Sequence, residues 1–109
     1  MNAQTQTAEK KARSRTDDNI VFIGNKPFMN YVTGVVMQFT TQNASEVIVK
    51  ARGKFISRAV DVAEVTRKRF LKEQNIDISK ILIDSEEFED KDGKKIKVST
   101  IEITLAKKK

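Results

Sequence analysis

The residues of this chain best suited to chemistry are the cations of residues 50–54, which read KARGK. The continuous apolar run of residues 47–49 leads into this stretch, and an apolar helical pattern follows it. Backbone amides at a helix start, a glycine without a side chain and several cationic groups then converge on one corner. Arg and Lys side chains in such a place bind anions, phosphate above all. We therefore expect a phosphate-binding corner here.

A second loop strengthens this expectation. Residues 24–27 (GNKP) follow the apolar run of residues 20–23 in the same way. If the two runs form adjacent parallel strands, both loops open at one edge of a sheet. Each cation alone is more often an ordinary solvated loop residue, but together they favour a functional patch. The residues that we expect to share it are Lys26, Arg52, Gly53, Lys54 and Arg58.

Composition favours a polyanionic partner and argues against catalysis. The chain has 109 residues with 21 Lys plus Arg against 15 Asp plus Glu, a net charge of +6. Residues 19–83 carry ten basic against five acidic side chains, so the surplus lies in the body of the domain. A basic balance of this kind suits polyanions such as nucleic acid or an anionic membrane surface. Cys and His are absent, which removes disulfides, thiolate metal sites and the commonest general base. We predict a protein that is not an enzyme and needs no cofactor.

Two further charged clusters have ordinary explanations. Arg67, Lys68 and Arg69 cannot all point one way on a helix, and late-helix cations complement the helix dipole. The acidic residues 84–90 match no calcium loop and alternate between strand faces, so we interpret them as a solvated surface without metal. No stretch approaches about 18 apolar residues, and the N-terminus lacks a secretory signal's apolar segment. We expect a cytoplasmic protein with neither a membrane nor a small-molecule substrate as partner.

The elements that position these residues follow the order β-α-β-α-β-β. We predict strands at residues 19–23, 46–51, 78–90 and 94–105, and helices at residues 27–39 and 53–72. We expect the first strand to be buried on both faces, or nearly so, because its apolar run is continuous. The fold class is a two-layer α/β domain, an α+β sandwich with two helices on one face of a mixed four-stranded sheet. It spans residues 19–107, and residues 1–18 form a disordered polar tail.

The last two strands form a hairpin whose far part, at about residues 84–98, projects as an arm. Asp92-Gly93 predicts a type I′ turn between them. Ile96 and Val98 are even-numbered, whereas Ile101, Ile103 and Leu105 are odd-numbered, so the apolar face changes along this strand. This change predicts a bulge or a twist near residues 99–100. The second helix has an apolar band too broad for one contact, which indicates a partner subunit. The residues expected at that interface are Val62, Val65 and Phe70.

The sequence resembles the Alba family of small basic archaeal chromatin and RNA-binding proteins. Three blocks carry the resemblance: IGNKPFMNYV (residues 23–32), IVKARGKFISRAVDVAEVTRKRF (residues 48–70) and VSTIEITLAK (residues 98–107). It implies a fold like the C-terminal domain of bacterial translation initiation factor three. It also implies homodimers whose loops contact the nucleic-acid backbone while hairpin arms reach along the grooves. By position, Lys26, Arg52 and Lys54 match backbone-contacting residues, and Phe70 matches a position where dimers meet side by side on DNA.

Two departures from the family pattern alter these expectations. The first loop of the family commonly reads Gly-Lys-Lys-Pro, with its first lysine as an acetylation switch. Here Asn25 holds that place, so only Lys26 can inherit a modification role. Residues 84–97 carry four basic against six acidic side chains, which predicts a weak grip by the arm. The arm cations that still reach phosphates are expected to be Lys91, Lys94, Lys95 and Lys97.

The sequence thus predicts sequence-tolerant binding of double-stranded DNA through backbone phosphates, for chromatin compaction in the nucleoid. We expect RNA binding as well, and the site residues then include Asn25 beside the loop cations. The main alternative is an RNA-binding protein or a non-catalytic ribonucleoprotein subunit, because the same cations suit A-form RNA. A third reading is an assembly subunit that binds protein through the second helix and Phe70.

Overall fold

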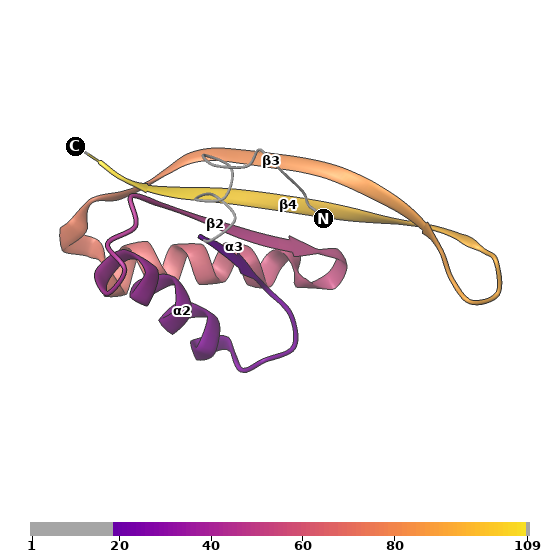
Figure 1. Ribbon diagram of the computed structural model, residues 1–109, viewed down its shortest axis with the longest axis horizontal. Helices are drawn as coiled ribbons and strands as arrows, with labels where there is room; N and C mark the ends of the chain where they lie inside the picture. The colour runs from indigo at the N-terminus through magenta and orange to yellow at the C-terminus, as the bar shows by residue number, and fades with distance from the viewer. Residues whose placement is uncertain (1–18, 109) are drawn as a thin grey trace.

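A computed structural model describes residues 19–108, which fold into a sheet with two helices on one of its faces (Figure 1). This confirms the predicted fold class and element order. The elements are β1 (Ile20–Phe22), α2 (Phe28–Thr40), β2 (Glu46–Arg52), α3 (Ile56–Val65), β3 (Ile76–Glu89) and β4 (Lys95–Lys107). The predicted tail, residues 1–18, lies outside the described residues.

The strands are ordered β1-β2-β4-β3, so β2 and β4 are central. β1 runs parallel to β2, and β4 runs antiparallel to both β2 and β3. Alternate residues of the central strands point toward the helices and are buried, as Val47, Val49, Ile103 and Leu105 are. This helix-facing side holds the core. No helix within residues 19–108 covers the opposite side of the sheet, which we call the open side (Figure 1).

The first strand is not buried on both faces as the sequence predicted. β1 has only three residues and forms one edge of the sheet. Ile23, directly after it, is buried, but Phe22 lies on the open side and is 67% exposed. A continuous apolar run therefore marks an edge strand here, with one aromatic side chain presented to solvent.

Helix α2 has the predicted apolar face, with Tyr31, Val32, Val35 and Phe39 buried. Pro27 precedes the helix, and its carbonyl accepts a hydrogen bond from the Asn30 N–H at 2.9 Å. The fixed φ of proline suits this start. Helix α2 thus begins where the first cationic loop ends.

The second helix is continuous over the predicted length but not uniform. A 3-10 turn (Gly53–Phe55) precedes α3, and a π-helical turn (Thr66–Phe70) follows it. The Leu71 N–H donates to the Thr66 carbonyl at 2.8 Å, the i→i+5 bond of such a turn. Leu71 is buried at the end of this turn, whereas Phe70 stays on the surface with 52% exposure.

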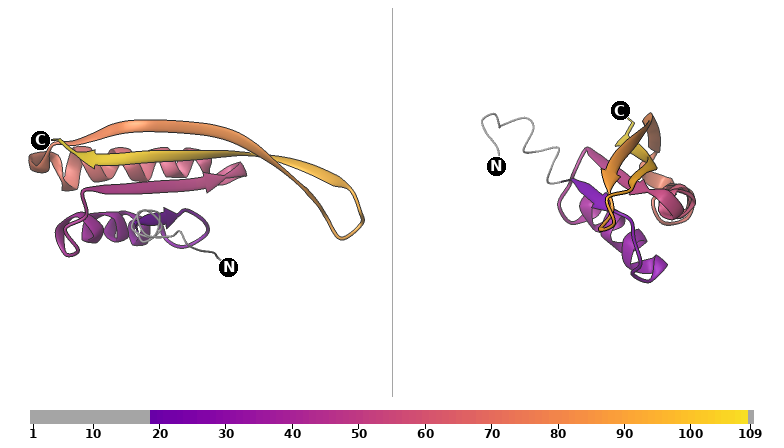
Figure 2. Two further views of the ribbon diagram at one scale, coloured as in Figure 1. Left: turned by 45° about the horizontal axis from the view of Figure 1, so that its top comes forward. Right: turned by 90° about the vertical axis from the view of Figure 1, so that its right-hand side faces the viewer.

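The hairpin of β3 and β4 continues beyond the sheet as a two-stranded arm (Figure 2). β4 pairs with β2 only from Thr100 to Ala106, but it pairs with β3 as far as Lys95 opposite Glu89. Of the bulge or twist predicted near residues 99–100, the bulge is wrong, because β4 keeps its register there and the irregularity lies between Ile78 and Lys80. The two parities of β4 instead serve two faces. Ile101 and Ile103 face the helices, while Val98 faces the open side.

The arm ends in a turn that differs from the predicted type I′. Gly93 has a positive φ of 81°, but Asp92 does not. The Gly93 N–H donates to the Asp90 carbonyl at 3.0 Å, which makes a type I turn followed by a left-handed glycine. The Asp90 carboxylate also accepts the N–H groups of Asp92 and Lys94 at 2.9 Å each. An acidic side chain therefore organises the backbone of the arm tip.

No helix within residues 19–108 has the length and apolar character needed to cross a membrane.

Candidate nucleic-acid interface

The two cationic loops leave the sheet side by side, as the sequence predicted. β1 and β2 are parallel and adjacent, and the Ile23 N–H donates to the Lys50 carbonyl at 2.9 Å. The pairing thus extends to the last residue before the first loop. The two loops define what we call the loop corner, which consists of Asn25, Lys26, Arg52, Gly53, Lys54 and Arg58.

A tyrosine that the sequence analysis passed over holds the first loop in place. The Tyr31 hydroxyl accepts hydrogen bonds from the backbone N–H groups of Gly24 and Lys26, each at 2.9 Å. Tyr31 is only 8% exposed and belongs to the core. The side chains of Asn25 and Lys26 are exposed, so the loop presents them from a fixed backbone. The chain's one tyrosine, four residues after Pro27, was the available signal.

Arg58 packs behind this loop rather than at its front. Its guanidinium carbon lies 6.0 Å from the centroid of the Tyr31 ring, a cation–π contact. The side chain is partly buried, and its Nε is buried without a hydrogen-bond partner among the described residues. Arg58 thus joins α3 to Tyr31 of α2, the residue that holds the first loop.

The second loop depends on Gly53. Its φ of +59° suits glycine, and a Cβ there would lie 3.5 Å from Cγ1 of Val98. Arg52 and Lys54 on either side of it are exposed. The Lys54 ammonium lies 5.5 Å from the Phe55 ring centroid. The glycine therefore turns the chain tightly from β2 into the helix while both cations face solvent.

Carboxylates from the hairpin reach this loop, which the sequence did not predict. Arg52 Nη1 lies 2.7 Å from Glu86 Oε1 of the arm, and both side chains are more than half exposed. Lys50 Nζ lies 3.5 Å from Glu102 Oε2 and 5.5 Å from the Phe22 ring centroid. Exposed ion pairs of this kind are weak and exchange readily. The sequence analysis treated Glu86 as part of a solvated face, because strand register cannot be read from charge alone.

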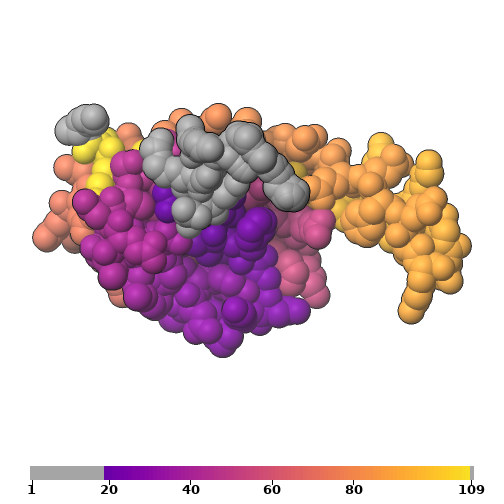
Figure 3. Space-filling model, in the orientation of Figure 1, coloured from indigo at the N-terminus to yellow at the C-terminus, as the bar shows by residue number. Residues whose placement is uncertain are grey.

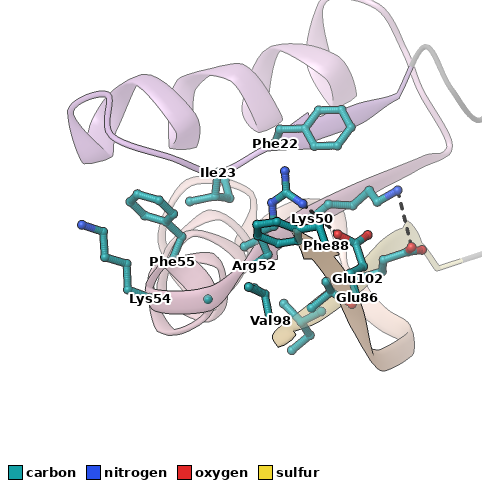
Figure 4. Close-up of a pocket in the computed structure, with 14 residues that line it drawn as sticks. Phe22, Ile23, Lys50, Arg52, Lys54, Phe55, Glu86, Phe88, Val98 and Glu102 are labelled. Carbon is teal, nitrogen blue, oxygen red and sulfur yellow. Dashed lines mark hydrogen bonds and ion pairs between the residues drawn. The ribbon is translucent and has the colours of Figure 1, made fainter. Parts of the chain in front are cut away.

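A cavity of about 690 Å³ opens beside the loop corner, on the open side of the sheet (Figure 4). Residues from β1, β2, β4 and the arm line it, including Phe22, Lys50, Arg52, Phe88 and Val98. Lys26 lines a separate hollow on the other side of Phe22. Arg52 and Lys54 of the loop corner therefore border, together with Lys50, a partly apolar depression that the sequence did not predict.

The arm cations lie apart from the loop corner, since the arm projects away from the body (Figure 3). All four are exposed: Lys91, Lys94, Lys95 and Lys97. The strand register sets Lys95 opposite Glu89 and Lys97 opposite Glu87. Cross-strand neighbours of opposite charge attract each other. The structure thus divides the predicted site residues into two separate groups.

The residues predicted for a protein interface also separate. Val62 has no exposed surface and Val65 packs partly against the core, so Val62 is corrected from an interface residue to a core residue. The broad apolar band of the second helix is used mainly within the chain. Phe70 is exposed, as an interface residue must be.

Other apolar side chains are exposed in places that the sequence analysis missed. Val60 of α3 is 42% exposed, and Ile81 and Ile83 of β3 are 55% and 77% exposed. Ile81 pairs with Ile103 and Ile83 with Ile101, so both point to the helix-facing side of the sheet. An uncovered apolar patch next to a core is typical of an interface. In the sequence, the apolar run of residues 81–83 could have predicted this patch.

Two of the three late-helix cations, Arg67 and Lys68, share one carboxylate partner. Glu64 forms ion pairs with Arg67 at 2.8 Å and with Lys68 at 3.3 Å. Burial raises the pKa of the Glu64 carboxyl, but hydrogen bonds and charge attraction from Arg67 and Lys68 outweigh it and leave the pKa below its usual value. This agrees with the structural role expected for these cations. Within residues 19–108, no cluster of three or more acidic side chains could hold a metal ion.

The fold and the site define a small basic α+β domain with a cationic loop corner, an arm and no metal-binding cluster among the described residues. The family model named Alba matches residues 19–85, and the chain belongs to the Alba family. The DNA/RNA-binding protein Alba of Methanococcus maripaludis is 57% identical over 83% of this chain and 99% of its own length. That of Nanoarchaeum equitans is 63% identical over 81% and 97%.

A solved structure agrees. Alba from Thermoplasma volcanium superimposes with a TM-score of 0.74 at 49% identity, covering 82% of this chain and all of its own.

Proposed function

We propose that this protein binds double-stranded DNA through backbone phosphates, without reading sequence, and so compacts and organises the chromosome. One observation carries the proposal: two pre-organised cationic loops open at the same edge of the sheet. The names of the relatives, DNA/RNA-binding protein Alba, support nucleic acid as the ligand. The protein then acts by binding and not by catalysis, and its place is the nucleoid.

The residues of the loop corner have different roles in this proposal. Lys26, Arg52 and Lys54 contact phosphates, with the planar guanidinium of Arg52 suited to two phosphate oxygens. Asn25 supplies a polar contact beside them, while Gly53 and Arg58 set the loop geometry. The arm cations add weaker contacts farther along the backbone. Loop cations on a fixed backbone contact phosphates without selecting bases, which suits packaging of any sequence.

A homodimer would double this surface. Ile81 and Ile83 form an exposed apolar patch on β3 that a second copy would cover, and Val60 is exposed on α3. Phe70 lies at the end of the second helix, available for side-by-side contact between dimers on DNA. Acetylation of Lys26 would remove one phosphate contact and so weaken binding.

Salt titration tests the proposal most directly. The affinity for a 24-base-pair duplex should fall steeply between about 0.05 and 0.2 M salt, with a log–log slope near −0.9 per phosphate contacted. Two duplexes of unrelated sequence should bind alike. An affinity that is flat across this range would reject phosphate binding.

RNA is the second candidate, because the relatives' printed name includes it. The loop corner suits A-form phosphates equally well, so the protein would then serve as a ribonucleoprotein subunit. Competition between duplex DNA, duplex RNA and single strands at one salt concentration ranks the ligands. Sedimentation of the wild type beside Ile83→Lys tests the dimer, since a lysine in the patch should give monomers.

A further inference from the structure

We infer that the cavity beside the loop corner binds one unpaired nucleotide of a nucleic-acid strand, its base against Phe22 and Phe88 and its phosphate on Arg52. The inference rests on the proposed function and adds a preference within it. Duplex binding needs only the loop cations. The cavity would add affinity where a base is out of the stack, at a bulge, an end or a single-stranded stretch.

Two exposed aromatic rings are the first observation. Phe22 is 67% and Phe88 44% exposed, and both line the cavity. Phe22 reaches the cavity from β1 and Phe88 reaches it from the arm (Figure 4). Aromatic rings exposed at one cavity offer faces on which any base stacks. Two rings from separate elements offer a base more stacking surface than a single exposed phenylalanine does.

The size and walls of the cavity fit such a ligand. Its volume of about 690 Å³ lies within the range of small-molecule sites. Val98 forms an apolar wall, while Thr100 and Glu102 place polar groups along it. A base needs apolar surface for its faces and polar partners for its edges, and this cavity offers both.

Charge at the cavity fixes where the phosphate lies. Arg52 lines the cavity and holds the Glu86 carboxylate at 2.7 Å. A carboxylate and a phosphate present similar paired oxygens to a guanidinium, so Glu86 marks the phosphate position. The ion pair is exposed, so its exchange for phosphate costs little. Lys50 and Lys54 line the same cavity and add attraction for the strand.

Base pairing decides which nucleotides can enter. Within a duplex, both faces of a base are covered by its neighbours, so no ring of the protein can stack on it. An unpaired base has free faces and splays out readily. The cavity therefore discriminates unpaired from paired nucleotides rather than one base from another.

The test uses the full chain and a 16-base-pair duplex, either perfect or with one unpaired 2-aminopurine, made in DNA and in RNA. Wild type should prefer the bulged duplex by about fivefold to a hundredfold, the range for one base–aromatic stack. The fluorescence of the 2-aminopurine should change on binding. The DNA and RNA arms show which sugar the cavity accepts.

Phe22→Ala and Phe88→Ala should abolish this preference and the fluorescence change while affinity for the perfect duplex is kept. Phe22→Leu and Phe88→Leu retain apolar bulk but lose the aromatic face, so they should lose the preference as the alanine variants do. Because leucine keeps the apolar volume, such a loss would not come from misfolding. Met29→Ala, which removes another exposed apolar side chain, should keep the preference.

Equal wild-type affinity for perfect and bulged duplexes would overturn the inference and leave the proposed function standing. So would phenylalanine variants that weaken both ligands equally. Failure to bind any duplex at about 0.1 M salt would overturn both.

Discussion

The loop corner and the arm each present exposed lysine or arginine side chains, but they hold them in different ways. The corner fixes its backbone through Tyr31 and through adjacent parallel strands. The arm is a two-stranded ribbon beyond the sheet, and its register sets Lys95 and Lys97 opposite glutamates. Cations already held in position lose less freedom on binding. We therefore expect the geometry of the cations, more than their number, to decide where phosphate binds.

The largest effect should separate the two regions. Lys26→Ala with Arg52→Ala should weaken duplex DNA binding about tenfold or more at 0.1 M salt, and the log–log salt slope should shrink by about two per subunit. Lys95→Ala with Lys97→Ala removes the same charge from the arm and is the matched control. Titrations by fluorescence anisotropy at several salt concentrations measure both.

We expect the arm pair to cost only a few-fold, because glutamates oppose these lysines. Equal losses for the two pairs would show that charge alone matters and that pre-organisation of the corner contributes nothing.

The next effect concerns what holds the corner. Tyr31→Phe removes the hydroxyl that accepts the Gly24 and Lys26 N–H groups, which should lower the free energy of unfolding by about 1–2 kcal/mol. DNA affinity should fall several-fold although no cation is lost. Urea denaturation and duplex titration measure the two quantities. A destabilised variant that binds with unchanged affinity would contradict the role given to this loop.

A smaller effect tests the contact between the two regions. Glu86→Gln removes the carboxylate beside Arg52 and frees the guanidinium for phosphate. Duplex affinity should rise by up to about fivefold, in line with an exposed ion pair worth at most about 1 kcal/mol. Glu87→Gln makes the same charge change on the opposite face of the arm. If both variants gain equally, the gain comes from net charge and not from Arg52.

The smallest expected effect is on stability and concerns Glu64, which lies outside the loop corner and the arm. A Glu64 variant is therefore a reference for changes that leave DNA binding unaltered. The pKa of Glu64 is lowered in the folded state, so its ion pairs stabilise the fold above the unfolded value of about 4.5. This stability is lost as pH falls through the folded pKa. Glu64→Gln should therefore cost about 0.5 kcal/mol at pH 7, a value set by the partial exposure of the pairs. Urea denaturation should show the difference from wild type vanish in strong acid, while DNA affinity at pH 7 stays unchanged.

Much of the fold follows from sequence because its signals are local. The spacing of apolar residues in α2 and the Gly53 turn both predict the elements found. The predictions that were wrong depend on strand register and on which elements pack against each other in the fold. Val62 has the same apolar character as Val60, yet only the packing of α3 on the sheet decides which is buried.

The same limit applied to the candidate site. The corner cations are adjacent in sequence to their loops and could be named in advance. The contacts of Glu86 and Phe88 with the corner could not, because Glu86 is 34 residues from Arg52 and the register of the arm brings them together. In β4 the apolar residues change from even to odd numbers. This change meant that Ile96 and Val98 face the open side, but from sequence alone a bulge or a twist explained it equally well.

The hydroxyl of Tyr31 that anchors the first loop has an optical consequence. The chain has one tyrosine and no tryptophan, so its intrinsic ultraviolet emission comes from this one ring. The ring contacts Arg58 and its hydroxyl bonds the loop backbone, but the ring lies beneath the exposed surface of the first loop. The protein thus carries its own label-free reporter, whose quantum yield and lifetime follow the state of a single loop.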